Sequence, residues 1–113
     1  MGILLYIIAT ILWILITPIN WVIVSFKHGL SNGYFTETAI DIDKFGNRNF
    51  RTFLNASMRL KNGYKFGNVN ETISSALGKN QRDKTLSWFG IGICFVLDKI
   101  EKDHCEKSIN ENV

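Results

Sequence analysis

The stretch from Ile3 to Phe26, ILLYIIATILWILITPINWVIVSF, decides how the rest of the chain is organised. It contains no Asp, Glu, Lys, Arg or His, and every charged side chain of the protein lies after it. A helix of this length measures roughly 36 Å, which exceeds the roughly 30 Å hydrocarbon core of a bilayer. Its many Ile, Leu and Val residues favour insertion into lipid. The sequence therefore predicts a transmembrane anchor over residues 1–26.

Two other interpretations of this stretch fit less well. A secretory signal peptide has a basic segment, a shorter apolar core and a small-x-small cleavage site, and this stretch has none of them. A buried helix of a soluble protein would need more surrounding chain than the remaining residues supply. Pro18 removes one backbone hydrogen bond and is expected to kink the span. Asn20 is expected either to reach the interface or to contact a partner helix, which would make a homo-oligomer through the span.

The orientation of the span follows from the basic residues near its ends. Only the N-terminal amine precedes it, whereas Lys27 and then Lys44 and Arg48 follow, so the positive-inside rule favours a cytoplasmic C-terminal domain. Cys94 and Cys105 are the two cysteines of the chain, and their spacing matches no C-x-x-C, zinc or haem motif. They would stay reduced in the cytosol and could pair in an oxidising compartment.

Positive charge is concentrated in the middle of the chain. Residues 44–84 contain nine Lys or Arg but only two acids, Glu71 and Asp83. Such a segment would suit anionic lipid headgroups or an acidic protein partner, and solubility alone explains it equally well. Nucleic acid is a weaker alternative, because no recognised binding motif accompanies the charge.

Beyond the anchor, the sequence predicts a linker over residues 27–33 and a small helical domain over residues 34–113. The first helix is predicted over Tyr34–Phe45, and Gly46 is expected either to end it or to bend it. The second is predicted over Asn47–Leu60, where apolar residues recur at helical spacing. The sequence thus indicates an all-α protein, with one transmembrane helix followed by a bundle of three to four short helices.

Two further helices complete the expected bundle. Asn70 is expected to cap a helix of barely two turns, and Gly78 is expected to stop it. The next helix is predicted over Thr85–Lys102 as the centre of the domain. Its apolar core, Trp88–Leu97, is too short to span a bilayer. An interfacial or re-entrant helix beside the anchor is the alternative for this segment.

The candidate site residues lie in the segment FGNVNETISSALGK (66–79) and in the D-H-C run near the C-terminus; they are Glu71, Ser74, Ser75, His104 and Cys105. The hydroxyl groups either cap helices and bind nearby backbone, or form a polar site with Asn55 and Lys79. Adjacent residues on a helix point about 100° apart, so His104 is poorly placed to activate Cys105. Zinc needs three or four ligands, which the chain scarcely offers. The sequence predicts no cofactor or metal site, since it also lacks G-x-G-x-x-G and P-loop motifs.

The series FGNRNF…FLN…GYKFGN…ETISS…LGKNQRD…LDKIEKDHCEKSI resembles a group of small proteins encoded by tailed bacteriophages and prophages. The likeness covers about residues 41–109, and the E-T-I-S-S run followed by D-H-C is its most specific part. The resemblance implies a viral origin but no mechanism. The residues that it singles out are Asn55, Gly67, Glu71, Thr72, Ser74, Ser75, His104 and Cys105.

Two classes of function follow from these features. In the first, the chain is a single-pass phage membrane protein that acts by interaction, as a lysis accessory, a holin-like protein or an exclusion factor. In the second, it is a membrane-tethered enzyme whose site combines the E-T-I-S-S helix with the D-H-C end. The first is favoured. The two differ in whether these segments converge on a polar cavity or only brace each other.

Overall fold

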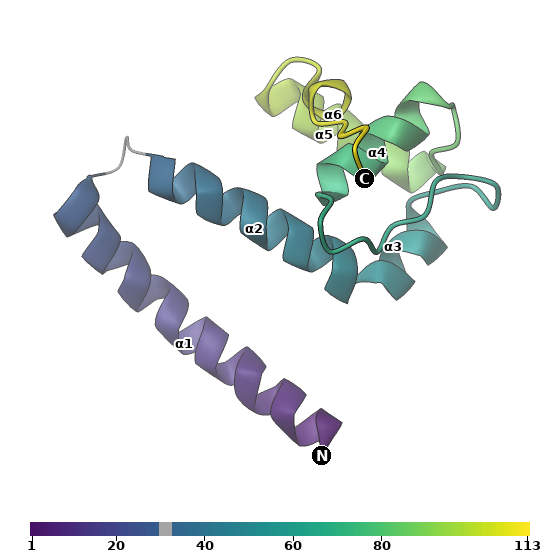
Figure 1. Ribbon diagram of the computed structural model, residues 1–113. Coiled ribbons are helices and arrows are strands. Elements are labelled where there is room, and N and C mark those ends of the chain that lie inside the picture. The colour runs from purple at the N-terminus through teal and green to yellow at the C-terminus, as the bar shows by residue number, and fades with distance from the viewer. Residues whose placement is uncertain (30–32) are drawn as a thin grey trace. The chain divides into compact units, whose positions relative to one another are not determined.

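A computed structural model describes residues 1–29 and 33–113, and the described part is built from helices (Figure 1). The prediction of an all-α protein with one long apolar N-terminal helix followed by shorter helices is confirmed. The chain divides into two compact units, residues 1–38 and 39–113. The second unit contains the candidate site.

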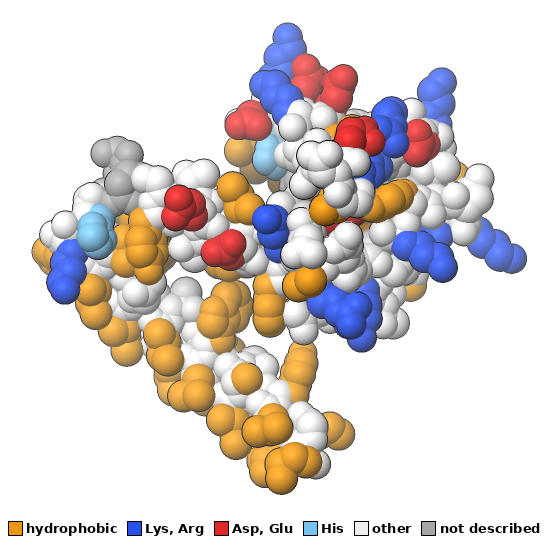
Figure 2. All heavy atoms as spheres, viewed as in Figure 1, with side chains coloured by type: hydrophobic (Ala, Val, Ile, Leu, Met, Phe, Trp, Pro, Cys, Tyr) orange, Lys and Arg blue, Asp and Glu red, His pale blue; other side chains and the backbone are white. Residues whose placement is uncertain are grey.

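The first unit is dominated by α1, Gly2–His28, which runs two residues past the predicted end of the anchor. Its length and composition suffice to cross a membrane, and none of its most apolar 18-residue window is buried. Figure 2 shows hydrophobic side chains along the length of this helix. Pro18 lies inside the helix, and Asn20 Nδ2 lies 3.4 Å from Oη of Tyr34 within the same unit.

Helix α2, Gly33–Asn49, is longer than predicted. The predicted linker is correspondingly shorter, because Lys27 and His28 belong to α1 and Gly33 begins α2; residues 30–32 lie outside the described part. Of the two roles predicted for Gly46, that of ending the helix is wrong. Gly46 is buried inside α2, where a Cβ would lie 3.2 Å from Cδ1 of Ile73, so the glycine serves close packing.

The helix predicted over residues 47–60 is broken at Phe50, and only α3, Arg51–Ser57, follows. Leu54 and Met58 of the predicted stripe are buried, whereas Phe50 and Phe53 are more than half exposed. The residues that follow α3 pair with residues 85–87 through backbone hydrogen bonds. Leu60 N donates to Thr85 O at 2.7 Å, and Ser87 N donates to Met58 O at 3.1 Å.

Helix α4, Ile73–Arg82, is polar in sequence yet is the most buried helix of the domain. Its N-cap is Thr72 rather than the predicted Asn70, and Thr72 Oγ1 accepts from Ser75 N at 3.0 Å. Gly78 does not stop it, because Gly78 packs directly on the backbone of Cys105 and a Cβ would collide there. The seven residues from 74 to 80 are all buried.

Helix α5, Trp88–Ile100, begins at the N-cap Ser87, whose Oγ accepts from Gly90 N at 3.1 Å. A short helix, α6, His104–Lys107, follows and packs against both α4 and α5. The apolar core lies between these elements, and Phe89, Ile93 and Leu97 of α5 pack against it. Its buried members are Leu54, Met58, Phe66, Ala76, Leu77, Leu86, Cys94 and Cys105.

The two glycines of α5 provide a matched stability test. A Cβ on Gly90 would collide with the backbone oxygen of Met58, whereas a Cβ on Gly92 would meet nothing within 4 Å. Gly90→Ala should lower the free energy of unfolding by about 1–3 kcal/mol, as overpacking does. Gly92→Ala should raise it by up to about 1 kcal/mol, since alanine is the better helix former. Equal shifts in the denaturation midpoint would show that this close approach does not exist.

Candidate functional site

The buried carboxylate of Glu71, directly before α4, is the centre of a closed polar cluster. Its side chain is fully buried and forms an ion pair with Lys79, with Oε2 2.7 Å from Nζ. Ser75 Oγ donates to Oε2 at 2.7 Å, and Tyr64 Oη donates to Oε1 at 2.8 Å. Lys79 Nζ also donates to the backbone oxygen of Val113 at 2.7 Å and lies 4.5 Å from the centre of the Tyr64 ring. Both carboxylate oxygens of Glu71 therefore have protein partners.

The electrostatics of this cluster favour the ion pair. Burial raises the pKa of Tyr64 above 10.0, and its hydrogen bond to Glu71 raises it further, so the phenol stays protonated and donates. Burial by itself would lower the pKa of Lys79. The bonds to Glu71 and Tyr64 outweigh that effect, and the pKa of Lys79 rises above 10.5. The cluster thus holds a charged lysine and a neutral tyrosine, neither of which is poised to exchange protons near neutral pH.

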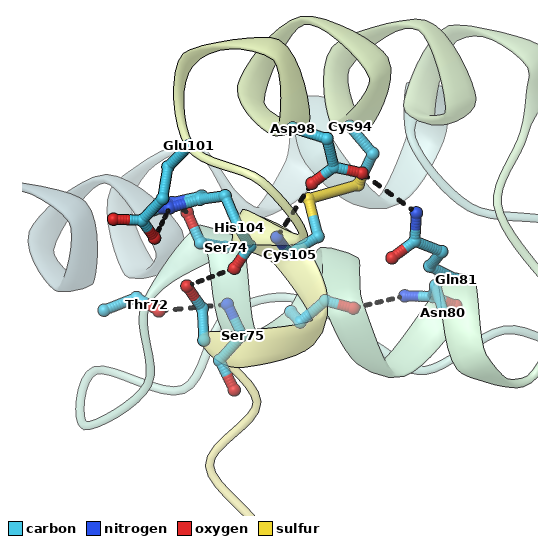
Figure 3. The surroundings of a disulfide bond; sticks show 12 residues. Thr72, Ser74, Ser75, Asn80, Gln81, Cys94, Asp98, Glu101, His104 and Cys105 are labelled. Atoms are coloured by element: carbon cyan, nitrogen blue, oxygen red, sulfur yellow. Dashed lines mark hydrogen bonds and ion pairs between the residues drawn. A yellow bond between two sulfur atoms is a disulfide. The ribbon is translucent and has the colours of Figure 1, made fainter.

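A second chain of polar contacts joins α2, α4 and α6. Asp43 caps the N-terminus of α4, since its Oδ1 accepts from Ile73 N at 2.8 Å and its Oδ2 accepts from Ser74 Oγ at 3.1 Å. His104 Nε2 lies 3.1 Å from Ser74 Oγ, and His104 Nδ1 lies 3.1 Å from Glu101 Oε1 (Figure 3). Ser74, His104 and Glu101 thus form a chain in which each side chain lies within hydrogen-bond distance of the next.

This order resembles a Ser-His-acid triad, but the proton positions do not match one. A nucleophilic serine must donate its hydroxyl proton to the imidazole. Ser74 has one such proton, and the Asp43 carboxylate is an acceptor only, so the proton goes to Asp43. The ring nitrogen Nε2 of His104 must then donate to Ser74. The arrangement stabilises the α4 N-terminus and does not activate a nucleophile.

Cys105 is not a free thiol, because it forms a disulfide with Cys94 (Figure 3). The Cα atoms of the two residues are 6.2 Å apart, and the described chain has no free cysteine. Asp98 Oδ1 accepts from Cys105 N at 3.1 Å, which holds the start of α6 beside α5. The interpretation of Cys105 as a nucleophile is therefore wrong for this form of the protein, since a nucleophile must be a thiolate.

Three asparagines, two of which sequence reasoning missed, hold the long loop between α3 and α4. Asn55 accepts from Phe66 N at 2.8 Å and donates to Phe66 O at 3.0 Å. Asn80 binds both backbone groups of Tyr64 in the same way, at 2.8 and 2.9 Å. Asn47 donates to the backbone oxygen of Glu71 at 2.9 Å. Asn55 thus serves the loop and joins no site with Lys79.

The same asparagine cradle explains one glycine singled out by the phage resemblance. Gly67 has a φ of +130°, which L side chains rarely adopt, and its N–H donates to Asn47 Oδ1 at 3.2 Å. The sequence offered no periodic signal for Asn47 or Asn80, because their partners are backbone groups 16 to 24 residues away.

The E-T-I-S-S helix and the D-H-C end do come together, as the candidate site required, but they brace each other. Ser74 contacts His104, and Ser75 Oγ accepts from Asn110 N at 2.9 Å. No buried side-chain nitrogen or oxygen in residues 1–29 and 33–113 lacks a hydrogen-bond partner. A surface hollow beside α4 and α6 is lined by none of the five candidates; its lining residues are Gly78, Gln81, Arg82, Glu106, Ile109 and Glu111.

Among the described residues, no group of three or more His, Cys, Asp or Glu is placed to hold a metal ion.

Comparison with known proteins assigns no family to the chain. No protein-family model matches the chain, and no curated protein or solved structure matches it either.

Proposed function

We propose that this chain is a membrane-anchored interaction protein, in which α1 tethers a small disulfide-linked helical domain that acts by contact rather than by catalysis. The observation that carries the proposal is that the candidate catalytic side chains are already engaged in contacts that hold the domain together. Glu71 is bound by three side chains, Ser74 gives its proton to Asp43, and Cys105 is oxidised. The small size, the single apolar helix long enough to span and the basic segment of the domain suit a role in host lysis or in exclusion of other phages.

In this proposal the domain lies on the oxidising side of the membrane, opposite to the cytoplasmic orientation that the basic residues favour. The Cys94–Cys105 disulfide supports the reversal, because disulfides persist in oxidising compartments and are rare in the cytosol. The count of basic residues is a weak counterargument. Lys27 and His28 form the end of α1, and none of the next fifteen residues, 29–43, is a lysine or an arginine.

Expression of the full-length chain in a bacterium tests the proposal. The chain should impair growth or membrane integrity, and His104→Ala should keep most of that effect because no chemistry depends on the imidazole. Reversing the charges of the exposed Arg48, Arg51, Lys61 and Lys65 should weaken it, since attraction to anionic surfaces is worth about 1 kcal/mol per basic residue.

The opposite pattern would favour the enzyme. If His104→Ala were inactive at normal membrane levels while the charge reversal had no effect, the Ser74–His104–Glu101 chain would be catalytic after all. A full-length chain that leaves growth and membrane integrity unchanged would contradict the lysis and exclusion roles. Immunoblots of the membrane fraction control for the amount of each variant.

A further inference from the structure

Helix α5 has an apolar face that nothing in its own domain covers. We call Trp88, Ile91, Phe95, Val96 and Ile100 the α5 outer face; their exposed fractions are 84, 58, 62, 55 and 79 per cent. The segment from 85 to 97 contains no charged residue. Soluble domains rarely expose a contiguous apolar surface of this kind unless it binds something.

The outer face is a fixed surface and not a poorly packed part of the core. The opposite side of α5 is in place, since Phe89, Ile93 and Leu97 pack against the core and Gly90 lies on the backbone of Met58. Phe53 of α3, itself 56 per cent exposed, meets Phe89 edge to face at 6.4 Å between ring centres. Phe53 thus adds an exposed aromatic ring beside the part of α5 that packs on the core.

The chain itself keeps the second unit close to any bilayer that α1 crosses. α1 ends at His28 and α2, which continues into the second unit, begins at Gly33, so five Cα–Cα steps separate the two helices. Such a connection reaches at most about 18 Å. A domain tethered this closely experiences a high effective concentration of lipid surface.

The composition of the face and its borders matches the headgroup layer. Trp88 places an amphipathic ring at one end of the helix, as in the aromatic belts of membrane proteins. Lys99 Nζ lies 5.0 Å from the centre of the Phe95 ring, so its stem lies along apolar surface while the long side chain lets the charge reach the headgroups. Lys84 and Lys102, both exposed, flank the two ends of α5 and would meet anionic headgroups.

We infer that the α5 outer face lies in the interface of the same bilayer that α1 crosses, with α5 parallel to the membrane plane. At 13 residues α5 is too short to span, so it can only lie on the surface. The inference goes beyond the proposed function, because it names the surface that one face of the domain occupies whether or not the chain acts in lysis.

Trp88 is a native probe of this contact. With Trp13→Phe and Trp21→Phe in α1, the full-length chain keeps Trp88 as its one tryptophan. Reconstituted into vesicles of phosphatidylcholine and phosphatidylglycerol in equal parts, its emission should be quenched about twofold or more by lipids brominated on the acyl chains. Acrylamide in the water should quench it correspondingly less than in the unfolded chain.

Two variants separate the contact from the fold. Ile91→Asp with Phe95→Asp changes only exposed positions, so the disulfide and the denaturation midpoint should be retained while quenching by brominated lipid is lost. Val69→Asp, equally exposed at 56 per cent but outside α5, should leave the quenching unchanged. Trp88 that is quenched by acrylamide and not by brominated lipid would overturn the inference. Trp88 shielded from both, with shielding that fades as the lipid-to-protein ratio rises, would also overturn it and assign the face to a second copy of the chain.

Discussion

Lys79→Met should lower the free energy of unfolding by about 3–5 kcal/mol, one of the largest losses that a single substitution in this domain can cause. The change removes the cation from the fully buried Glu71 carboxylate, whose Oε2 lies 2.7 Å from Nζ. Glu71 must then either stay charged without its partner or take up a proton, and both cost free energy. Denaturant unfolding of the full-length chain in detergent, followed by near-UV circular dichroism, measures the loss.

A second substitution and a surface lysine provide the controls. Glu71→Gln in the Lys79→Met background removes the unpaired charge and keeps hydrogen-bond groups for Tyr64 and Ser75, so it should restore much of the stability. Lys65→Met, at an exposed position of the same loop, should change the free energy of unfolding by less than about 0.5 kcal/mol. A Lys79→Met variant as stable as Lys65→Met would show that Glu71 is not buried in this way.

Thiol labelling of the full-length chain in sealed spheroplasts should give an all-or-none result. A membrane-impermeant maleimide should not react before reduction, because Cys94 and Cys105 are joined. Because both cysteines are buried in the folded domain, an impermeant reductant must act long enough for the domain to open transiently; both residues should then be labelled, since the proposed orientation puts the domain outside the inner membrane. Mass spectrometry of the labelled peptides reads out both sites.

One cysteine variant and the order of treatment distinguish the two orientations and the two states of the thiols. Cys105→Ser should leave Cys94 unpaired, so that unfolded protein is labelled at one site without reductant. Labelling that requires lysis of the inner membrane would restore the cytoplasmic orientation. Labelling of intact wild-type protein without reductant would show that the two thiols are free.

The sequence predicted most reliably what depends on local pattern. An uninterrupted apolar run predicted α1, and the apolar periodicity of the later segments predicted helices close to α4 and α5. The errors arise where tertiary contacts override local rules. Gly46 and Gly78 have the chemistry of helix stops, yet both lie inside helices because Ile73 and the backbone of Cys105 approach them closely. The break at Phe50 falls within an amphipathic pattern that continues across it.

Sequence reasoning named several residues that the structure brings together, but not the contacts that they make. Ser74 and His104 do meet, but the residue that decides their chemistry is Asp43, which lies 31 residues before Ser74 and belongs to neither motif. Tyr64 likewise completes the Glu71 cluster from a loop with no regular spacing. Polar contacts of this kind depend on which backbone segments lie side by side, and a single sequence has no periodicity that records it.

The burial of a polar helix beneath an apolar one has a consequence for how such a chain can change over generations. Each polar residue of α4 has a specific partner, so most replacements there must be matched by a second replacement elsewhere. The α5 outer face needs only to remain hydrophobic, and many aliphatic or aromatic residues meet that need. Substitutions should therefore accumulate in the hydrophobic α5 and be rare in the polar α4. In an ordinary water-soluble bundle the polar positions vary most.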